Sequence, residues 1–405
     1  MASQLLKDLA LQSAIIPKES PFATRKKSKS LTIGLPKEIS YQENRIGLTP
    51  DAVSILVRNG HEINVEKGAG DGANFSDEEY SNAGARLVYS HKEVFASDVI
   101  LKIEPLVSEE FEIIKPESTL ISTLNLPNLS KSYFDQLNDK KITGIAFEHI
   151  EDKVGDFPVI RAMSEIAGST VLLIAAEYLN SIQNGKGIIL GGITGVPPTR
   201  VVILGAGTVA EYATRTALGL GADIKVFDTH IYRLQRLQYA VGNRIFTSII
   251  DSETLSKALE DADVVIGAMR GEKGQSPMVV TEEMVSKMKP NSIIIDVAID
   301  QGGCFETSEM TNHREPVFKK HDVIHYCVPN IASRFAHTAS ITLSNIFSPF
   351  LIKTGTLGGI EEMIFTNKWF MKGVYTYKGS ITNYHLAQKF NLRYRDLGLL
   401  LAARI

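Results

Sequence analysis

The sequence predicts an α/β protein built from two Rossmann-like, doubly wound domains, with the second domain inserted into the first. Short apolar runs alternate with amphipathic helical stretches from Leu31 onward, a pattern that is typical of parallel sheets covered by helices. A glycine-rich connection at residues 185–198 separates two such series. The chain of 405 residues is also too long for one ordinary hydrophobic core.

The first series begins with a strand at residues 31–35. A helix follows at residues 50–59, with Pro50 near its start and Gly60 at its end. Further strands are expected in three apolar runs, at residues 63–65, 99–103 and 119–124. A long apolar helical stretch, residues 165–179, then interrupts the alternation.

The second series is stronger and the chain becomes helical again after it, at residues 338–352. Its strands are expected at residues 201–204, 224–227, 264–268, 292–297 and 323–326. We therefore expect a three-part division of the chain. It consists of an N-terminal tail (1–30), a first domain (31–158 with 336–405) and an inserted second domain (159–335).

Composition excludes several classes of partner. The net charge is −3, from 43 basic and 46 acidic residues, so we expect neither nucleic acid nor an anionic membrane as a partner. We expect no apolar run long enough to span a bilayer. Cys304 and Cys327 form no metal-ligand pattern, so we interpret them as buried reduced thiols of a cytoplasmic protein without a metal site.

A dinucleotide-binding motif opens the second series. The buried strand at residues 201–204 runs directly into Gly205-Ala206-Gly207-Thr208-Val209-Ala210, a G-x-G-x-x-A pattern, and a helix follows. Gly205 permits the tight turn, and Gly207 lets the backbone approach a pyrophosphate. Thr208 and Val209 begin the helix whose N-terminus faces the phosphate charge. A glycine-rich turn without a cofactor is the alternative, which the complete strand–loop–helix context disfavours.

Asp228 specifies the kind of dinucleotide. It lies 23 residues after Gly205, at the end of the next strand, where a carboxylate accepts hydrogen bonds from both ribose hydroxyls. The same carboxylate repels a 2′-phosphate, which favours NAD over NADP. Arg233 is a further candidate cofactor contact; Arg233 and the neighbouring Arg236 either soften this preference or are exposed helix charges.

Three more charged residues are candidates for substrate chemistry. Asp300 follows a strand at the edge where open α/β sheets bind ligands, and it either transfers protons, orients substrate or caps a loop. Arg45 joins a strand to a helix and is either a bidentate carboxylate ligand or a surface arginine. Lys102 ends an apolar strand and either reaches a ligand or extends to solvent.

Several motifs together resemble the alanine dehydrogenases and the related nucleotide-binding domain of proton-translocating nicotinamide nucleotide transhydrogenase. Besides the Gly205 loop, these are GLPKE at 34–38 with Asn44-Arg45, MSEIAG at 163–168, GGITGV at 191–196, IDQGGCFE at 299–306 and YCVPN at 326–330. The resemblance runs from about Leu31 to the C-terminal region. Residues 301–306 are more similar to the dehydrogenases than to the transhydrogenase.

The resemblance implies oxidation of L-alanine by NAD and water to pyruvate, ammonium and NADH, in the cleft between two domains of a homo-oligomer, a hexamer or a dimer. It implies that Arg45 binds the substrate carboxylate and that Asp300 is catalytic. It also implies cofactor contacts at four positions, Ser164, Gly207, Asp228 and Asn330.

The chain departs from the family pattern at two positions. The family carries Lys-x-Lys-Glu-Pro after the third strand, whereas this chain reads Lys102-Ile103-Glu104-Pro105, with the first lysine alone. The family places a catalytic histidine between two leucines, where this chain has Asn125. Asn125 donates and accepts hydrogen bonds but does not shuttle protons near neutral pH. We expect Lys102 and Asn125 to contact the substrate.

The function predicted from these residues is the NAD-dependent, reversible oxidative deamination of L-alanine. Two alternatives stay open. One is a nucleotide-binding module without dehydrogenase activity, inside a transhydrogenase-like or regulatory assembly. The other is a dehydrogenase of another amino acid.

Overall fold

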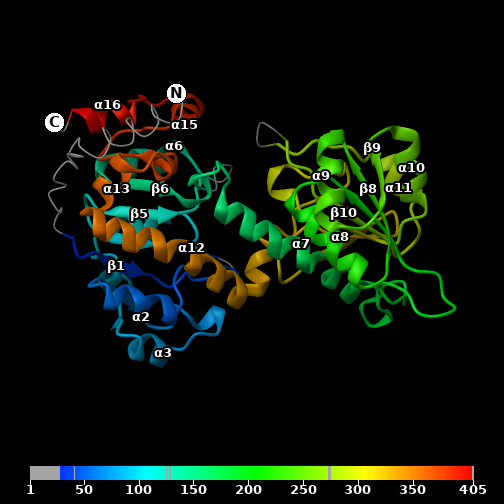
Figure 1. Cartoon of the computed structure of the whole chain (residues 1–405), viewed down its shortest axis with the longest axis horizontal. Helices are drawn as coiled ribbons and strands as arrows, with labels where there is room; N and C mark the ends of the chain where they lie inside the picture. Colours follow the sequence, from blue (N-terminus) through cyan, green and yellow to red (C-terminus); the bar gives the residue numbers. More distant parts are fainter. Residues whose placement is uncertain (1–27, 41, 125, 127–128, 272–274, 404–405) are drawn as a thin grey trace, which may run out of the picture.

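In the computed structural model, the described residues are 28–403 without 41, 125, 127–128 and 272–274. Within them the chain forms two seven-stranded sheets, each covered by helices, which lie in two lobes (Figure 1). The predicted fold class is confirmed. Most of the predicted N-terminal tail lies outside the described residues.

The first sheet has the order β14-β6-β5-β4-β1-β2-β3. Its strands are β1 (Thr32–Leu35), β2 (Glu62–Glu66), β3 (Arg86–Val88), β4 (Val99–Leu101), β5 (Thr119–Ser122), β6 (Thr143–Ala146) and β14 (Val374–Thr376). All neighbours are parallel except β14, which pairs antiparallel with β6. The central strands β1, β4 and β5 are mostly apolar and buried, as expected for a sheet that helices cover on both faces.

The second sheet has the order β12-β13-β11-β10-β7-β8-β9. Its strands are β7 (Arg200–Leu204), β8 (Asp223–Asp228), β9 (Phe246–Ile249), β10 (Val264–Gly267), β11 (Ile293–Asp296), β12 (Val317–Lys320) and β13 (Val323–Tyr326). The chain winds outward from β7 in one direction and from β10 in the other, so the crevice for a ligand lies at the carboxyl ends of these two strands. In the first sheet the corresponding point lies between β1 and β4.

Helices fill the layers on both sheets. In the first lobe they are α2 (Pro50–Arg58), α3 (Asp77–Asn82), α4 (His91–Val94), α5 (Ser108–Ile113), α6 (Lys131–Asp139), α13 (Ile360–Thr366), α14 (Lys368–Met371), α15 (Tyr384–Phe390) and α16 (Leu397–Ala402). In the second lobe they are α8 (Thr208–Gly219), α9 (Ile231–Val241), α10 (Ser252–Glu260) and α11 (Glu282–Ser286). Short 3-10 turns η1 (Asp71–Ala73), η3 (Phe147–His149), η4 (Ser181–Gln183), η5 (Ile299–Gln301) and η6 (Ile331–Phe335) join them.

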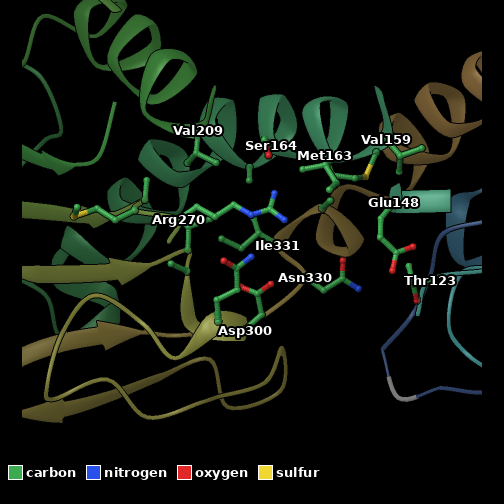
Figure 2. A pocket seen from close by; sticks show the side chains of 18 of the residues that line it. Thr123, Glu148, Val159, Met163, Ser164, Val209, Arg270, Asp300, Asn330 and Ile331 are labelled. Atoms are coloured by element: carbon green, nitrogen blue, oxygen red, sulfur yellow. The ribbon is translucent and has the colours of Figure 1, made fainter. Parts of the chain in front are cut away.

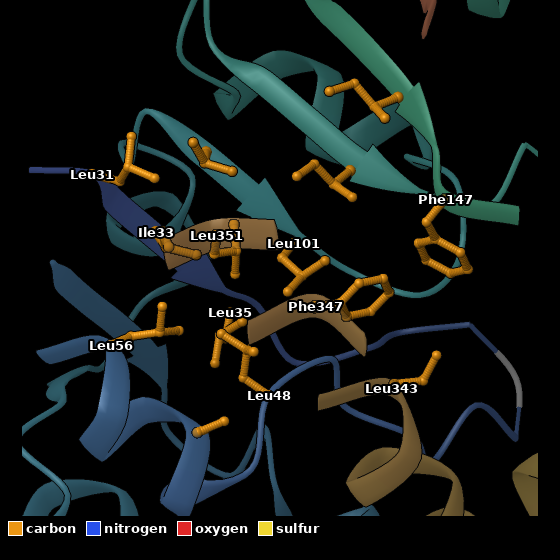
Figure 3. Close-up of a cluster of buried hydrophobic side chains, with 14 of the residues drawn as sticks. Leu31, Ile33, Leu35, Leu48, Leu56, Leu101, Phe147, Leu343, Phe347 and Leu351 are labelled. Atoms are coloured by element: carbon orange, nitrogen blue, oxygen red, sulfur yellow. The ribbon is translucent and has the colours of Figure 1, made fainter. Parts of the chain in front are cut away.

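Two 22-residue helices run between the lobes, α7 (Pro158–Leu179) and α12 (Ala336–Leu357) (Figure 1). After the second sheet, α12 returns the chain to the first lobe, where Leu343, Phe347 and Leu351 pack against β1 and Leu101 (Figure 3). The strand β14 then completes the first sheet. The second lobe is therefore an insertion in the first, as the sequence predicts.

Helix α7 corrects one expectation. By length and composition it is apolar enough to cross a membrane, although we expected no apolar run of that length. Half of its most apolar window is buried inside the protein, and Gly168 lets it pack closely on α8, because a Cβ at Gly168 would lie 2.4 Å from the carbonyl oxygen of Val209. The buried hydrophobic residues of α7 from Ala167 to Leu179 belong to the hydrophobic core of the second lobe.

Candidate functional site

Three connected cavities form a cleft between the lobes. The loop cavity lies beside Gly205 and Gly207 and has a volume of about 270 Å³. The inner cavity lies beside Ser164 and has a volume of about 360 Å³. The outer cavity lies beside Glu104 and has a volume of about 520 Å³. The loop and inner cavities share three lining residues, Ala268, Met269 and Arg270. The inner and outer cavities share five, Arg45, Thr123, Glu148, Asp300 and Asn330. The cleft therefore runs without interruption from the glycine loop to Arg45.

The glycine loop has the geometry of a phosphate site. Gly205 has φ +104°, and a Cβ there would lie 2.5 Å from the carbonyl oxygen of Ala268, so the turn requires glycine. Gly207 is the N-cap of α8, and a Cβ there would meet only open space. Thr208 begins α8, and Val209 lines the inner cavity. The free approach to Gly207 and the N-terminus of α8 fit a pyrophosphate.

Asp228 lies at the end of β8, beside the glycine loop. Its Oδ2 accepts a hydrogen bond from the backbone N–H of Ala206 at 2.7 Å, and its Oδ1 accepts one from the backbone N–H of His230 at 2.8 Å. Arg233 lines the same loop cavity, half-buried against Tyr232. Arg236 instead donates to the carbonyl oxygen of Ala206 at 3.1 Å, so it supports the glycine loop, a role that its helix position did not indicate.

Arg45 is 8% exposed and lines both the inner and the outer cavity. Its Nε and Nη2 donate to Glu43 at 2.8 and 2.6 Å, and its Nη1 lies 3.6 Å from the sulfur of Met163. Burial alone would raise the pKa of Glu43, but the charge and hydrogen bonds of Arg45 outweigh it, so that pKa lies below its ordinary value. The ion pair holds one edge of the guanidinium and directs the Nη1 side toward the cavity. The surface alternative for Arg45 is thereby wrong.

Asn330 connects the two lobes at this point. It follows β13, has φ +60°, and lines both the inner and the outer cavity. Its Nδ2 donates to Oε2 of Glu43 at 2.8 Å, and the hydroxyl of Ser333 donates to the carbonyl oxygen of Gln42 at 2.8 Å. The loop that carries Arg45 is thus bound to the second lobe.

Asp300 lies in η5, just after β11, and is exposed to the inner and outer cavities. The cleft walls remove it partly from water and raise its pKa above the ordinary value, while the charge of Arg270 lowers the pKa by a smaller amount. The neighbouring Asp296 is buried and accepts from the backbone of Cys304 and the hydroxyl of Ser308. Asp300 is therefore the carboxylate that faces the cleft, and Asp296 fixes the loop.

Lys102 does not line any of the three cavities. Its side chain is fully buried, and its Nζ donates to both carboxylate oxygens of Glu110 at 2.7 Å. Glu110 in turn bonds His91, which bonds Glu66. This geometry contradicts the alternative in which Lys102 extends to solvent, because its side chain turns into the domain core. Its expected contact with substrate stays a prediction.

Asn125 lies outside the described residues, so its expected contact stays a prediction. The two described residues before it, Thr123 and Leu124, lie at or beside the cleft. Thr123 lines the inner and outer cavities, and the backbone N–H of Leu124 donates to Oε1 of Glu148 at 2.7 Å.

Sequence reasoning missed four charged residues of the cleft, Glu43, Glu104, Glu148 and Arg270. Each follows a strand of one of the two sheets in the chain, β1, β4, β6 or β10, and that position was the available signal. No group of three His, Cys, Asp or Glu in the described part of the chain is arranged to hold a metal ion. Cys304 and Cys327 are buried and free, as expected, and burial raises the pKa of both thiols to about 12.

Comparisons with known protein families and with curated proteins match most of the chain. The model described as "Alanine dehydrogenase/PNT, N-terminal domain" matches residues 34–167, and its C-terminal counterpart matches residues 171–384. An alanine dehydrogenase of Methanococcus maripaludis is 39% identical over 369 residues, which cover 90% of this chain and 98% of that protein.

Solved structures show the same architecture. A structure of L-alanine dehydrogenase matches with a TM-score of 0.85 and 34% identity, over 89% of this chain and 99% of the other. A transhydrogenase from Sinorhizobium meliloti matches with a TM-score of 0.75 and 23% identity, over 87% of this chain and 99% of the other. The second likeness concerns the fold alone.

Proposed function

The chain belongs to the alanine dehydrogenase/PNT family, and from this premise we propose that it catalyses the NAD-dependent, reversible oxidative deamination of L-alanine to pyruvate and ammonium. One observation carries the proposal. Arg45, a fixed cation that suits a carboxylate, lines the same inner cavity as Asp300 and Ser164, and this cavity opens directly into the glycine-loop cavity.

The cofactor proposal rests on the loop cavity. The amides at the N-terminus of α8 would hold the pyrophosphate, and Asp228 with Arg233 would contact the adenosine ribose. Ser164, Val209 and Asn330 would contact the nicotinamide end, because all three line the inner cavity. When bound, the nicotinamide supplies the hydride acceptor for the substrate Cα.

The substrate proposal assigns one task to each side chain. The Nη1 side of Arg45 binds the carboxylate, and Met163 beside it packs against the small side chain of alanine. Asp300, whose pKa is raised, assists proton transfer while the carbinolamine forms and breaks down. Asn125 would donate a hydrogen bond to the substrate from the adjoining segment.

The decisive experiment is NADH formation by the purified full-length protein with L-alanine and NAD+ at alkaline pH, with pyruvate, ammonium and NADH as the reverse assay. D-Alanine and NADP+ are the matched controls, and both should give much lower rates. Absence of NADH formation at high alanine, with NADH binding intact, would refute the proposal.

A panel of other amino acids and 2-oxo acids in the same assay tests the second candidate, a dehydrogenase of another amino acid. The outer cavity of about 520 Å³ favours that candidate, because it adjoins Arg45 and gives room for a longer side chain. A higher kcat/KM for a longer amino acid than for alanine would establish it.

We also propose that the protein is a cytoplasmic homo-oligomer, a hexamer or a dimer. The family supports the assembly, and the two buried free thiols support a reducing compartment. Sedimentation velocity of the purified protein measures the size, and a monomer at micromolar concentration would contradict it.

A further inference from the structure

The inner cavity presents two carboxylates on opposite walls (Figure 2). Glu148 comes from η3 of the first lobe, and Asp300 comes from η5 of the second lobe. The other charged side chains among its described lining residues are Arg45 and Arg270, both cations. A substrate bound by its carboxylate at Arg45 therefore lies between two groups that can carry protons.

The reaction needs two such groups, and this step of the argument rests on the proposed function. After hydride leaves Cα, water adds to the protonated imine, the nitrogen must gain a proton to leave, and the new hydroxyl must lose one. One carboxylate cannot give a proton to the nitrogen and also take one from the hydroxyl oxygen without reorienting.

Other titratable residues of the cleft are less suited to the second role. Glu43 is bound to Arg45 through both oxygens. Glu104 and His313 line the outer cavity but not the inner one. Glu148 lines both cavities, together with Asp300.

The backbone fixes the Glu148 carboxylate in place. It follows β6, at the carboxyl edge of the first sheet, between the buried Phe147 and the exposed His149. The N–H of Leu124 donates to its Oε1 at 2.7 Å. Figure 2 places Glu148 and Thr123 together, across the cavity from Asp300 and Arg270. The carboxylate is thus held at the inner cavity by the backbone of Leu124.

We propose that Glu148 is the second proton-transfer group of the reaction. Its carboxylate accepts a proton from water as the water oxygen bonds to Cα, and it then delivers that proton to the amino nitrogen. The C–N bond breaks with its electron pair on nitrogen, and ammonia leaves. Asp300 accepts the hydroxyl proton as the carbonyl of pyruvate forms.

The test compares Glu148→Gln, Glu148→Asp and Glu148→Ala with wild type, with Glu117→Gln, an exposed surface glutamate, as the control. For Glu148→Gln we expect kcat with alanine to fall by about 10²–10⁴-fold, since this is the usual loss for a general acid or base. The dissociation constant of NADH, from fluorescence titration, should change less than about twofold because NADH binding does not use this proton transfer. Glu148→Asp should keep more activity than Glu148→Gln, because it keeps the carboxylate.

Added formate should raise the rate of Glu148→Ala, because a small carboxylate enters the space of the missing side chain, and it should not raise the rate of wild type. A purely structural role would produce no such rescue. Wild-type kcat in Glu148→Gln, or a rate for Glu148→Asp below that of Glu148→Gln, would overturn the role of Glu148. A wild-type protein that forms no NADH with any amino acid would instead refute the proposed function, so the two failures are distinguishable.

Discussion

The guanidinium of Arg45 is held along one edge by the carboxylate of Glu43, with Nε–Oε1 and Nη2–Oε2 distances of 2.8 and 2.6 Å. Asn330 of the other lobe donates to the same Oε2 at 2.8 Å. A single buried carboxylate therefore aligns the guanidinium of Arg45 and connects it to the lobe that carries the glycine loop. Alignment of a binding group to within a fraction of an ångström decides how well it holds a substrate.

Glu43→Gln should raise the KM for alanine by about 10–100-fold. This increase corresponds to the loss of a hydrogen bond to a charged group, which contributes about 1.5–3 kcal/mol. The amide keeps the shape of the side chain but donates where Arg45 requires an acceptor, so the guanidinium loses its alignment. The dissociation constant of NADH should change much less. Steady-state kinetics of Glu43→Gln and Glu117→Gln check this, and an unchanged KM would contradict the positioning role.

Lys102→Met should destabilise the protein by about 3–5 kcal/mol, because it removes the fully buried cation that donates to both oxygens of Glu110 and leaves only the partly exposed His91 beside that carboxylate. The double variant Lys102→Met with Glu110→Gln should recover part of this loss, because it removes both charges. The measurement is the shift of the urea midpoint. If the variant instead keeps wild-type stability and loses alanine affinity alone, Lys102 contacts substrate as the sequence predicts.

The pH dependence of stability should carry a contribution from His91. Hydrogen bonds to Glu110 and Glu66 raise the pKa of His91 from 6.5 to about 9. Because the folded-state pKa is the higher one, this stabilisation is complete below about pH 6.5 and is lost as the pH rises through 9, by at most about 3 kcal/mol.

His91→Gln removes this contribution. The difference in unfolding free energy between wild type and His91→Gln should therefore shrink between pH 6.5 and pH 9. A difference that stays constant over this range would exclude the His91 ion pairs as its origin.

The fold could be predicted from the sequence because its evidence is local. Buried strands such as β7 and β10 are continuous apolar runs, and the glycine loop combines a strand, a turn and a helix start within ten residues. The edge strand β9 was missed because it is half-exposed and carries no such run. The strands β3, β6, β12 and β14 were also missed, because none of them has a continuous apolar run like that of β7.

Site residues could be predicted only where the residue type and its position after a strand together indicate a role. Asp228 and Asp300 follow strands of the cofactor lobe and lie in the cleft. The environment of Lys102 depends on Glu110 and His91, which lie in other elements, so its position after a strand did not reveal the ion pair. The position of Glu148 in the site could not be predicted for the same reason, because Glu148 and Asp300 line one cavity but come from different lobes.

Arg270 gives the last prediction, because it lines both the loop cavity and the inner cavity, between the phosphate site and Asp300. In Figure 2 its side chain extends into the cleft beside Asp300. Arg270→Met keeps the length of the side chain and removes its charge. We expect the dissociation constant of NADH to rise by about tenfold or more, since hydrogen bonds to charged groups contribute about 1.5–3 kcal/mol.

The same variant should change the pH profile of alanine oxidation. The charge of Arg270 lowers the pKa of Asp300 against the stronger effect of the cleft walls, so its removal raises that pKa further. Asp300 then stays protonated to higher pH, and the rising limb of kcat should move to higher pH. Arg58→Met, an exposed arginine at the end of α2, is the matched control and should leave both quantities unchanged. A wild-type pH profile together with wild-type NADH affinity in Arg270→Met would show that this arginine acts on neither the cofactor nor Asp300.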